Sequence, residues 1–312
     1  MKLVYCGTPL FAVPPLEALV GAGHAVQLVV TQPDRPKGRG MELALSPVKQ
    51  KALEFGLAIA QPEKIKNNLE FRAQLEALAP DCIVVVGYGR IIPRWMLDLP
   101  QHGNINLHAS LLPRYRGAAP IQWAIANGEC VTGNTTMRID EGLDTGDILL
   151  QRTMAIEAED TSVTLAPRLA AMGAGLLVET LAALAEHRAQ PTPQDNERAT
   201  LAPILTREDG RIHFERDTAQ TICNRYRGFQ PWPGAFTTFR GKQLTLHAIA
   251  SAAGAGELDC GEIKAAGGQL LAGCGGQTAI AIRELQLEGK RRMSAREFIN
   301  GYQLKAGERL GS

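Results

Sequence analysis

Short apolar runs alternate with amphipathic stretches through the first half of the chain. Strands are expected at Leu3–Cys6, Ala25–Thr31, Leu57–Ala60, Asp81–Gly87 and Ile105–His108, and helices at Pro14–Gly21, Pro47–Phe55 and Asn68–Leu78. The continuous apolar run within Asp81–Gly87 is typical of a strand that is buried on both faces. Repeated βα units predict an α/β fold with a mostly parallel, Rossmann-like sheet between two layers of helices.

The second half shows a different pattern. A long helix rich in Ala and Leu is expected at Thr161–Glu186, and a Pro-rich segment with little apolar periodicity follows it. We therefore predict one domain at 1–190, a linker at 191–206 and a second domain at 207–312. In the second domain, short strands separated by Gly-rich turns predict an OB-like β-barrel. These strands are expected at Arg211–Phe214, Ala235–Phe239, Gln243–Ile249, Gly261–Ala265, Gln269–Gly273 and Thr278–Leu287.

The distribution of charge separates the two halves further. The whole chain of 312 residues carries a formal net charge of only +1, but residues 207–312 hold 15 Lys and Arg against 11 Asp and Glu. A modestly basic second domain fits a polyanionic partner, although ordinary scatter of surface charge explains it equally well.

Cysteine usage and hydropathy indicate the compartment. The six cysteines form no C-x-x-C pair, which suits a reducing cytosol and argues against a disulfide framework or a structural zinc site. The chain begins directly in a strand without a basic and apolar leader, and no uninterrupted apolar run approaches the length of a membrane span. We expect a cytoplasmic protein with no membrane contact, no obligate protein partner and no need for more than a monomer.

The segment from Asn106 to Gly117 carries the clearest chemistry. Asn106 and His108 stand two residues apart at the end of a strand, so their side chains are expected on the same face. In a parallel sheet, ligands bind beyond the carboxyl ends of the strands, and His108 lies at such an end. An amide to hold an oxyanion and an imidazole to move a proton are two of the parts that acyl transfer requires.

An acidic loop supplies the third part. Asp140, Asp144 and Asp147 lie in a segment with glycines at 142 and 146, and spacing alone does not select among them. At least one of these acids is expected to form a turn. Metal binding is the alternative, but no set of oxygen ligands is completed here, and we expect no metal.

The turn after the first strand resembles a nucleotide-binding motif only in part. Gly7-Thr8-Pro9 follows the first strand without a G-x-G-x-x-G pattern or a phosphate-binding Lys, so we expect a tight turn that lines the cleft rather than a nucleotide site.

Basic side chains recur at Arg35, Lys37 and Arg39, in a loop where Gly and Pro are expected to prevent regular structure, and again at Lys290-Arg291-Arg292. Such clusters suit phosphate backbones, with an ordinary solvated surface as the alternative. Arg114 and Arg116 are equally open to both readings.

Together these motifs closely resemble the methionyl-tRNA formyltransferases. The matching stretches are Gly7–Pro9, Thr31–Pro36 with Gly38–Gly40, Ser46–Lys49, Val86–Gly89, Asn106–Ile121, Gly142–Asp147 and Phe229–Gly234. The segment Asn106–Gly117 and the loop Leu143–Asp147 are common to transferases that use 10-formyltetrahydrofolate. The basic loop and the second domain are the parts that point to tRNA.

The resemblance implies specific roles. It selects Asn106, His108 and Asp144 as the catalytic trio, and places folate contacts at Ser110, Leu111, Leu112 and Pro113. The co-substrate is 10-formyltetrahydrofolate, with tetrahydrofolate as product, and the acceptor is the α-amine of methionyl initiator tRNA. Arg35, Lys37, Arg39 and the cluster Lys290–Arg292 are the expected tRNA contacts.

Two other functions are compatible with parts of this pattern. A formyltransferase acting on a small amine, such as an amino sugar nucleotide or glycinamide ribonucleotide, would not need the basic loop or a basic second domain. A non-catalytic RNA-binding protein would have no use for the intact trio of Asn106, His108 and Asp144.

Overall fold

The computed structural model describes residues 1–37, 42–252 and 258–311, and the chain forms two compact units. The first unit contains Met1–Pro120, Val131–Ala155 and Leu165–Pro203. The second contains Ile121–Cys130, Ile156–Thr164 and the chain from Ile204 onward. Two short segments that precede residue 165 therefore pack with the second unit, and the division between the units is not a single cut in the sequence.

The first unit alternates strands and helices. Its strands are β1 (Lys2–Gly7), β2 (Ala25–Val30), β3 (Arg35–Lys37), β4 (Glu42–Ala44), β5 (Ile59–Ala60), β6 (Cys82–Val86), β7 (Asn104–His108), β8 (Val131–Arg138) and β9 (Ile148–Ala155). Its helices are η1 (Leu10–Ala12), α1 (Val13–Gly21), α2 (Pro47–Glu54), α3 (Leu69–Leu78), α4 (Arg94–Leu97), α6 (Ser162–Ala185) and η2 (Asn196–Arg198).

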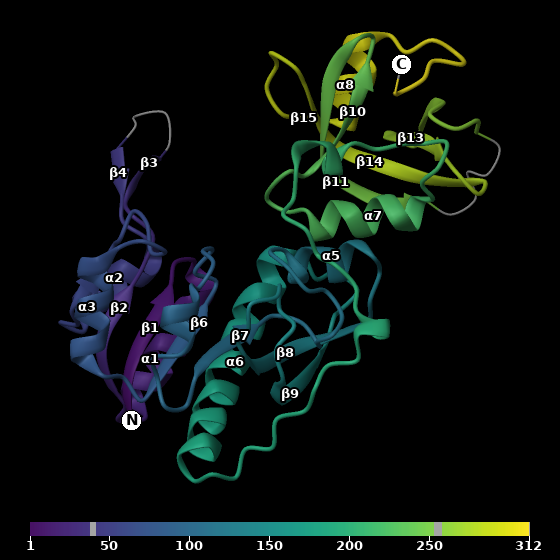
Figure 1. The fold of residues 1–312 in the computed structure, drawn as a ribbon. Coiled ribbons are helices and arrows are strands. Elements are labelled where there is room, and N and C mark those ends of the chain that lie inside the picture. The colour runs from purple at the N-terminus through teal and green to yellow at the C-terminus, as the bar shows by residue number, and fades with distance from the viewer. Residues whose placement is uncertain (38–41, 253–257, 312) are drawn as a thin grey trace. The chain divides into compact units, whose positions relative to one another are not determined.

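Seven of these strands form one sheet in the order β5-β2-β1-β6-β7-β8-β9 (Figure 1). The five strands from β5 to β7 are parallel, and β8 and β9 extend the sheet antiparallel to them. This arrangement confirms the mostly parallel sheet expected from the βα pattern. The strands β8 and β9 are additions that the sequence pattern did not reveal, because their polar residues interrupt the apolar alternation on which a strand prediction depends.

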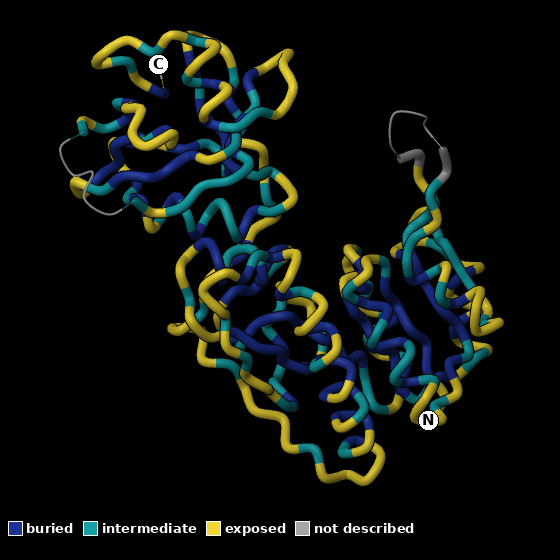
Figure 2. Tube along the Cα trace, turned by 180° about the vertical axis from the view of Figure 1, so that it is seen from behind, coloured by how far each residue is buried: buried dark blue, intermediate teal, exposed yellow. Residues whose placement is uncertain are grey.

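The alternation of side chains along the strands builds a core on each face of the sheet. On one face, Leu3 and Tyr5 of β1 pack in a cluster with residues of α1, α2 and α6. On the other face, Val4 and Cys6 pack with residues of α3 and α4. Figure 2 shows this interior as the buried part of the tube that runs through the central strands. Helices cover both faces of the sheet. A ligand can therefore reach the sheet only at the ends of its strands.

Helix α6 is long and apolar enough to cross a membrane by length and composition, but half of its most apolar window is buried inside the protein. Leu177, Leu181 and Leu184 pack in the same cluster as the strand residue Leu107. The hydroxyl oxygens of Thr136 on β8 and Thr180 on α6 lie 2.7 Å apart. Helix α6 is therefore a core helix of the first unit.

The basic loop departs from the expectation that Gly and Pro would exclude regular structure. Its two flanks pair as the antiparallel strands β3 and β4, with Arg35 opposite Ala44. Both strands of an isolated ribbon are edge strands, so a proline that lacks an N–H is tolerated in one of them. Arg39 lies outside the described residues.

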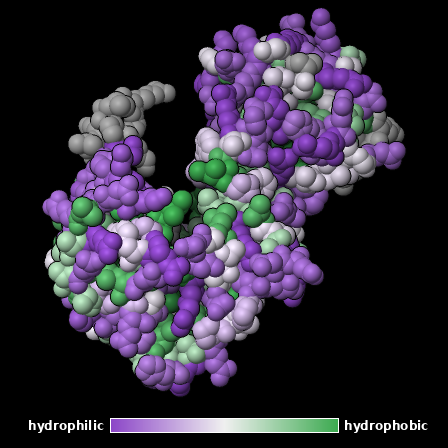
Figure 3. Space-filling view, in the orientation of Figure 1, coloured by the Kyte–Doolittle hydropathy of each residue, from purple (hydrophilic) through white to green (hydrophobic). Residues whose placement is uncertain are grey.

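The second unit is built mainly from antiparallel strands. Its elements are α5 (Pro120–Ala126), η3 (Arg207–Gly210), α7 (Ala219–Gly228), β10 (Ala235–Phe239), β11 (Lys242–Ala252), β12 (Ile263–Ala266), β13 (Gln269–Cys274), β14 (Thr278–Leu287), β15 (Met293–Ser294) and α8 (Ala295–Tyr302). The sheet order is β10-β11-β14-β13-β12, and β15 pairs with β14. The face of this unit that is visible in Figure 3 is largely hydrophilic.

The end of the chain makes this sheet barrel-like. Ile263 N donates to Glu308 O and Leu310 N donates to Gly261 O, both beside β12. Gly311 N donates to Thr238 O of β10. Residues 308–311 therefore bridge the two edge strands, as expected for a barrel that must satisfy its open edges.

In the second unit one predicted strand is wrong, and the helices α5, α7 and α8 were not predicted. Arg211–Phe214 makes only an isolated bridge between Arg211 and Phe236, because the chain leaves the sheet directly after it. Helix α7 follows, capped by Thr218, whose side chain accepts from Thr221 N. Helix α8 begins with a capping box formed by Ser294 and Glu297. Both helices are short and polar on one face, so their apolar residues resemble those of strands.

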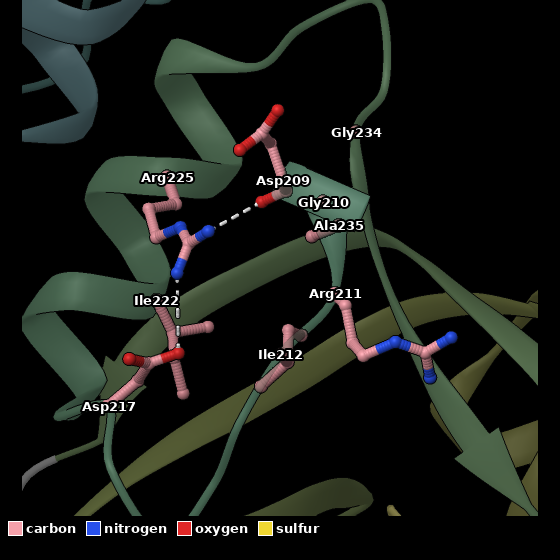
Figure 4. A pocket seen from close by; sticks show the side chains of 9 residues that line it. All are labelled: Asp209, Gly210, Arg211, Ile212, Asp217, Ile222, Arg225, Gly234 and Ala235. Carbon is pink, nitrogen blue, oxygen red and sulfur yellow. Dashed lines mark hydrogen bonds and ion pairs between the residues drawn. The ribbon is translucent and has the colours of Figure 1, made fainter. Parts of the chain in front are cut away.

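Helix α7 is held in place by Arg225 (Figure 4). Its Nη2 donates to Asp209 O at 2.7 Å, and its Nη1 lies 3.6 Å from Asp217 Oδ2. The surrounding cavity has a volume of about 10 Å³, room for roughly one water molecule. This partly buried ion pair is part of the packing of the second unit. The cavity is too small to hold a substrate.

Candidate active site

Asn106 and His108 lie on the same face of β7, at the end where ligands are expected. Asp144 lies in the loop between β8 and β9, and this loop turns back over β7. Asp144 Oδ2 is 3.6 Å from His108 Nδ1, and Asp144 Oδ1 is 3.5 Å from Asn106 Nδ2. The structure therefore brings the three predicted catalytic residues together, and of the three competing acids it places Asp144 beside the imidazole.

The conformation of Asp144 is unusual and is supported from outside its own loop. Its φ of 54° lies in the left-handed region, which few residues other than glycine adopt readily. Gly117 N donates to Asp144 Oδ2 at 2.8 Å, so the carboxylate is held on the side that faces His108. Asp140, in contrast, accepts from Gly142 N and from the Thr145 hydroxyl. Asp140 is the acid that forms the turn.

The hydrogen bond of His108 fixes its tautomer. His108 Nε2 lies 2.8 Å from Tyr115 O, and a carbonyl oxygen only accepts, so Nε2 carries the proton. In the neutral ring Nδ1 is then unprotonated and able to accept a proton. The His108 side chain is 6% exposed, and Asp144 Oδ2 is the carboxylate oxygen that faces Nδ1. A carboxylate at this distance compensates the positive charge that the ring acquires on protonation.

The four residues predicted to contact folate differ in exposure. Ser110 is fully buried and its hydroxyl donates to Arg114 O at 2.7 Å. Leu112 is buried, and its carbonyl accepts from Gln151 Nε2 at 2.8 Å. Leu111 and Pro113 are only partly buried. Side-chain contact with a ligand is therefore open to Leu111 and Pro113, while Ser110 and Leu112 fix the course of the loop.

The loop after β6 also lies at the carboxyl end of a sheet strand, and it is bonded to Gln32. Gln32 Nε2 donates to Tyr88 O at 3.0 Å, and Arg90 Nε donates to Gln32 Oε1 at 3.0 Å. Burial raises the pKa of the Tyr88 hydroxyl, which stays neutral. Ile91 is 90% exposed, an apolar side chain left in solvent at the carboxyl end of a sheet strand. Its exposure is visible only in the structure.

The predicted basic contacts lie in both units. Arg35 is exposed on β3. Lys290, Arg291 and Arg292 are exposed in the second unit, where Arg291 pairs with Glu297 at 3.0 Å and Arg292 pairs with Glu284. The backbone of Lys37 belongs to β3, but its side chain, like Arg39, lies outside what the structure describes.

Side-chain hydrogen bonds hold the start of the basic loop against α2 and against Gln61, which follows β5. Lys49 Nζ pairs with Asp34 and donates to Gln61 Oε1 at 2.6 Å. Gln61 Nε2 donates in turn to Asp34 Oδ1 at 2.9 Å. These hydrogen bonds lower the pKa of Asp34, and the bond from Lys49 has the largest effect. Within the described parts of the chain, no group of three or more His, Cys, Asp or Glu residues could hold a metal ion.

Arg116 was open to two readings, a phosphate contact or a solvated charge, and its surroundings rule out the second. Its side chain is buried, and its guanidinium donates to Gln194 Oε1 and to Asn196 Oδ1. Arg116 is therefore a structural residue of the site and not a solvated charge. Arg114 is exposed, with its guanidinium 5.3 Å from the centre of the Tyr115 ring.

The sequence and the fold match a known class of enzyme. Residues 1–181 match the formyl transferase family, and residues 204–303 match the family of formyl transferase C-terminal domains. Among solved structures, the chain is similar to the sugar 3N-formyl transferase WlaRD, with a TM-score of 0.66 over 93% of this chain and 99% of the other at 18% identity. HypX from Aquifex aeolicus is similar over 99% of this chain and 48% of its own, with a TM-score of 0.64 and 17% identity. The chain has the fold of a formyl transferase.

Relatives with higher sequence identity show which family within this class the chain belongs to. The methionyl-tRNA formyltransferase of Koribacter versatilis is 64% identical over 100% of this chain and 99% of its own length. That of Acidobacterium capsulatum is 62% identical over 100% of both chains. The chain belongs to the methionyl-tRNA formyltransferase family, as the resemblance of its motifs predicted.

Proposed function

We propose that the chain transfers the formyl group of 10-formyltetrahydrofolate to the α-amine of methionyl initiator tRNA, in the cytoplasm and as a monomer. Identity above 60% to methionyl-tRNA formyltransferases over the full length of both domains is the observation that carries this proposal. The similarity to a sugar formyl transferase, at 18% identity, concerns the fold alone and does not favour a small amine as acceptor.

The reaction requires one new C–N bond and the loss of another. The amine nitrogen attacks the formyl carbon, and the carbonyl oxygen becomes an oxyanion. Collapse of this tetrahedral intermediate breaks the bond to N10 of the folate, which takes up a proton and leaves as tetrahydrofolate. A free α-amine has a pKa of roughly 7.7–8, so a fair fraction is nucleophilic at neutral pH.

The trio has a role in each step. His108 Nδ1 takes the proton that the attacking amine loses, because Nε2 is committed to Tyr115 O. Asp144 Oδ2, 3.6 Å from Nδ1, compensates the charge of the protonated ring. The Asn106 amide carries two N–H groups, and one of them donates to the formyl oxyanion. His108 then returns its proton to the departing N10.

Residues of both units bind the two substrates in this proposal. Ser110–Pro113 shape the folate site, with Leu111 and Pro113 in contact with the cofactor. Arg35, Lys37 and Arg39 contact phosphates at the acceptor end of the tRNA, and Lys290, Arg291 and Arg292 contact its acceptor arm. Contacts of this kind neutralise phosphates and release counterions, so tRNA affinity falls steeply with salt.

The test is transfer of labelled formyl from 10-formyltetrahydrofolate to a panel of acceptors. Methionyl initiator tRNA should be labelled rapidly, while free methionine, an amino sugar nucleotide and glycinamide ribonucleotide should stay near background. Labelling of a small amine without labelling of the tRNA would contradict the proposal.

A further inference from the structure

The segment 192–202, which leads from the first unit toward the second, is bonded to the catalytic loops along its length. Thr192 and Ile148 exchange two backbone hydrogen bonds, at 2.8 and 2.9 Å. Ala202 N donates to Arg116 O at 2.7 Å, and Ala119 N donates to Ala202 O at 3.1 Å. Sequence composition, with its prolines and polar residues, gives no sign of these bonds.

Gln194 is the residue of this segment that reaches the catalytic acid. Its Nε2 donates to Asp144 O at 2.9 Å and to Gly146 O at 2.7 Å. These are the backbone carbonyls of the two residues on either side of Thr145. Asp144 has a left-handed backbone, and two residues hold it in place. Gln194 binds the backbone carbonyls of its loop, and Gly117 N binds its carboxylate.

Arg116 orients Gln194. Its Nη2 and Nε donate to Gln194 Oε1 at 2.7 and 3.1 Å, which directs the amide nitrogen of Gln194 at the Asp144 loop. Arg116 is 7% exposed, so this contact is made away from water. A planar guanidinium donating through two nitrogens holds its acceptor in one orientation.

The same segment holds the partner of His108. Tyr115 N donates to Thr200 Oγ1 at 2.9 Å, and Tyr115 O is the acceptor that fixes the tautomer of His108. Close packing leaves little freedom at Gly117, where a Cβ would lie 2.6 Å from Ala202 O. One stretch of chain thus braces the supports of both His108 and Asp144.

We propose that the segment 192–202 is a positioning strap of the active site, and that Gln194 is a positioning residue that acts on formyl transfer through Asp144. This inference depends on the proposed function and assigns a role that lies outside the catalytic trio. In this role Gln194 acts by holding the carboxylate at the distance that the imidazole requires. A displacement of about 1 Å at a catalytic group can cost on the order of 100-fold in rate.

Gln194→Glu is the most informative variant. It keeps the size of the side chain and an oxygen for Arg116, with which it can form an ion pair. It replaces the donor to Asp144 O and Gly146 O by an acceptor, so it repels the two carbonyls that Gln194 binds. We expect kcat to fall by about 10- to 100-fold, with KM for methionyl initiator tRNA within about 2-fold of the wild type.

Two further variants separate position from charge. Gln194→Met removes the donor without adding charge and should also lower kcat. Gln190→Glu makes the same chemical change at an exposed position four residues earlier, and should leave kcat and the unfolding temperature unchanged.

A double-mutant cycle decides whether Gln194 works through Asp144. In an Asp144→Asn background, Gln194→Glu should change the rate by less than about 3-fold, because the carboxylate that it positions is already gone. Losses that multiply would overturn the inference, as would a wild-type kcat in both Gln194 variants. A wild-type protein that fails to formylate the tRNA would instead refute the proposed function, and with it the role of Gln194 in that reaction.

Discussion

The substitution Asp144→Asn tests the electrostatic role of the acid with little change in shape. The amide oxygen of the variant can still accept from Gly117 N, so the loop is expected to keep its conformation. What is lost is the negative charge 3.6 Å from His108 Nδ1. At an effective dielectric constant of about 20, two unit charges at this separation interact by about 4–5 kcal/mol.

The expected loss of rate follows from that figure. The charge on His108 is only partly developed in the transition state, and Asp144 is partly exposed to solvent, so less than the full interaction is lost. Since about 1.4 kcal/mol corresponds to tenfold in rate, we expect kcat to fall by about 100- to 1000-fold. Single-turnover formyl transfer to methionyl initiator tRNA measures this directly, without interference from product release.

A matched control is available in the same loop. Glu141→Gln makes the same change from carboxylate to amide three residues away, on a side chain that is 70% exposed and 3.4 Å from Arg94. It should leave the rate within about 2-fold of the wild type. A fall of less than about 3-fold for Asp144→Asn, in a protein that still binds tRNA, would refute the electrostatic role of Asp144.

Three other predictions concern binding, packing and pH. Arg35→Ala should weaken tRNA binding and lower the slope of log affinity against log salt by about 1, as measured by filter binding; an unchanged slope would remove Arg35 from the interface. Gly133→Ala should lower stability by about 3 kcal/mol or more in chemical denaturation, because its Cβ would lie 2.1 Å from Arg152 O; near wild-type stability would show that β8 and β9 can separate there. The lowered pKa of Asp34 means that its hydrogen bond with Lys49 contributes stability above the ordinary carboxyl pKa of 3.8, and that this contribution is lost as the pH falls through the lower pKa of the folded state. Asp34→Asn should remove that part of the acid dependence of unfolding, and identical acid dependence in both proteins would contradict the assignment.

The sequence was sufficient where local pattern and chemistry agreed. The strand that ends in Asn106 and His108, and the buried strand β6, are both recognisable from apolar runs with defined ends. The choice of Asp144 among three acids came from the resemblance to a family and not from spacing. Its physical basis is the bond from Gly117 N and the left-handed backbone, which only the folded chain displays.

Other features of the structure could not be predicted from the sequence, because they depend on contacts between distant residues. Gln194 contacts a loop that lies 50 residues earlier in the chain, and a single polar residue among prolines carries no periodic signal. The strand expected at Arg211–Phe214 has the alternation of a strand but finds only a single bridge. Tertiary contacts decide both cases, and pattern alone does not contain them.

The proposed mechanism is tested most directly by a comparison of the wild type with His108→Ala. The measurement is the rate at which labelled formyl passes from 10-formyltetrahydrofolate to methionyl initiator tRNA, with the affinities for both substrates determined in parallel. We expect rapid transfer by the wild type and a collapse of transfer in the variant, with both affinities largely kept. Turnover by the variant within a few-fold of the wild type would contradict the claim that His108 moves the proton.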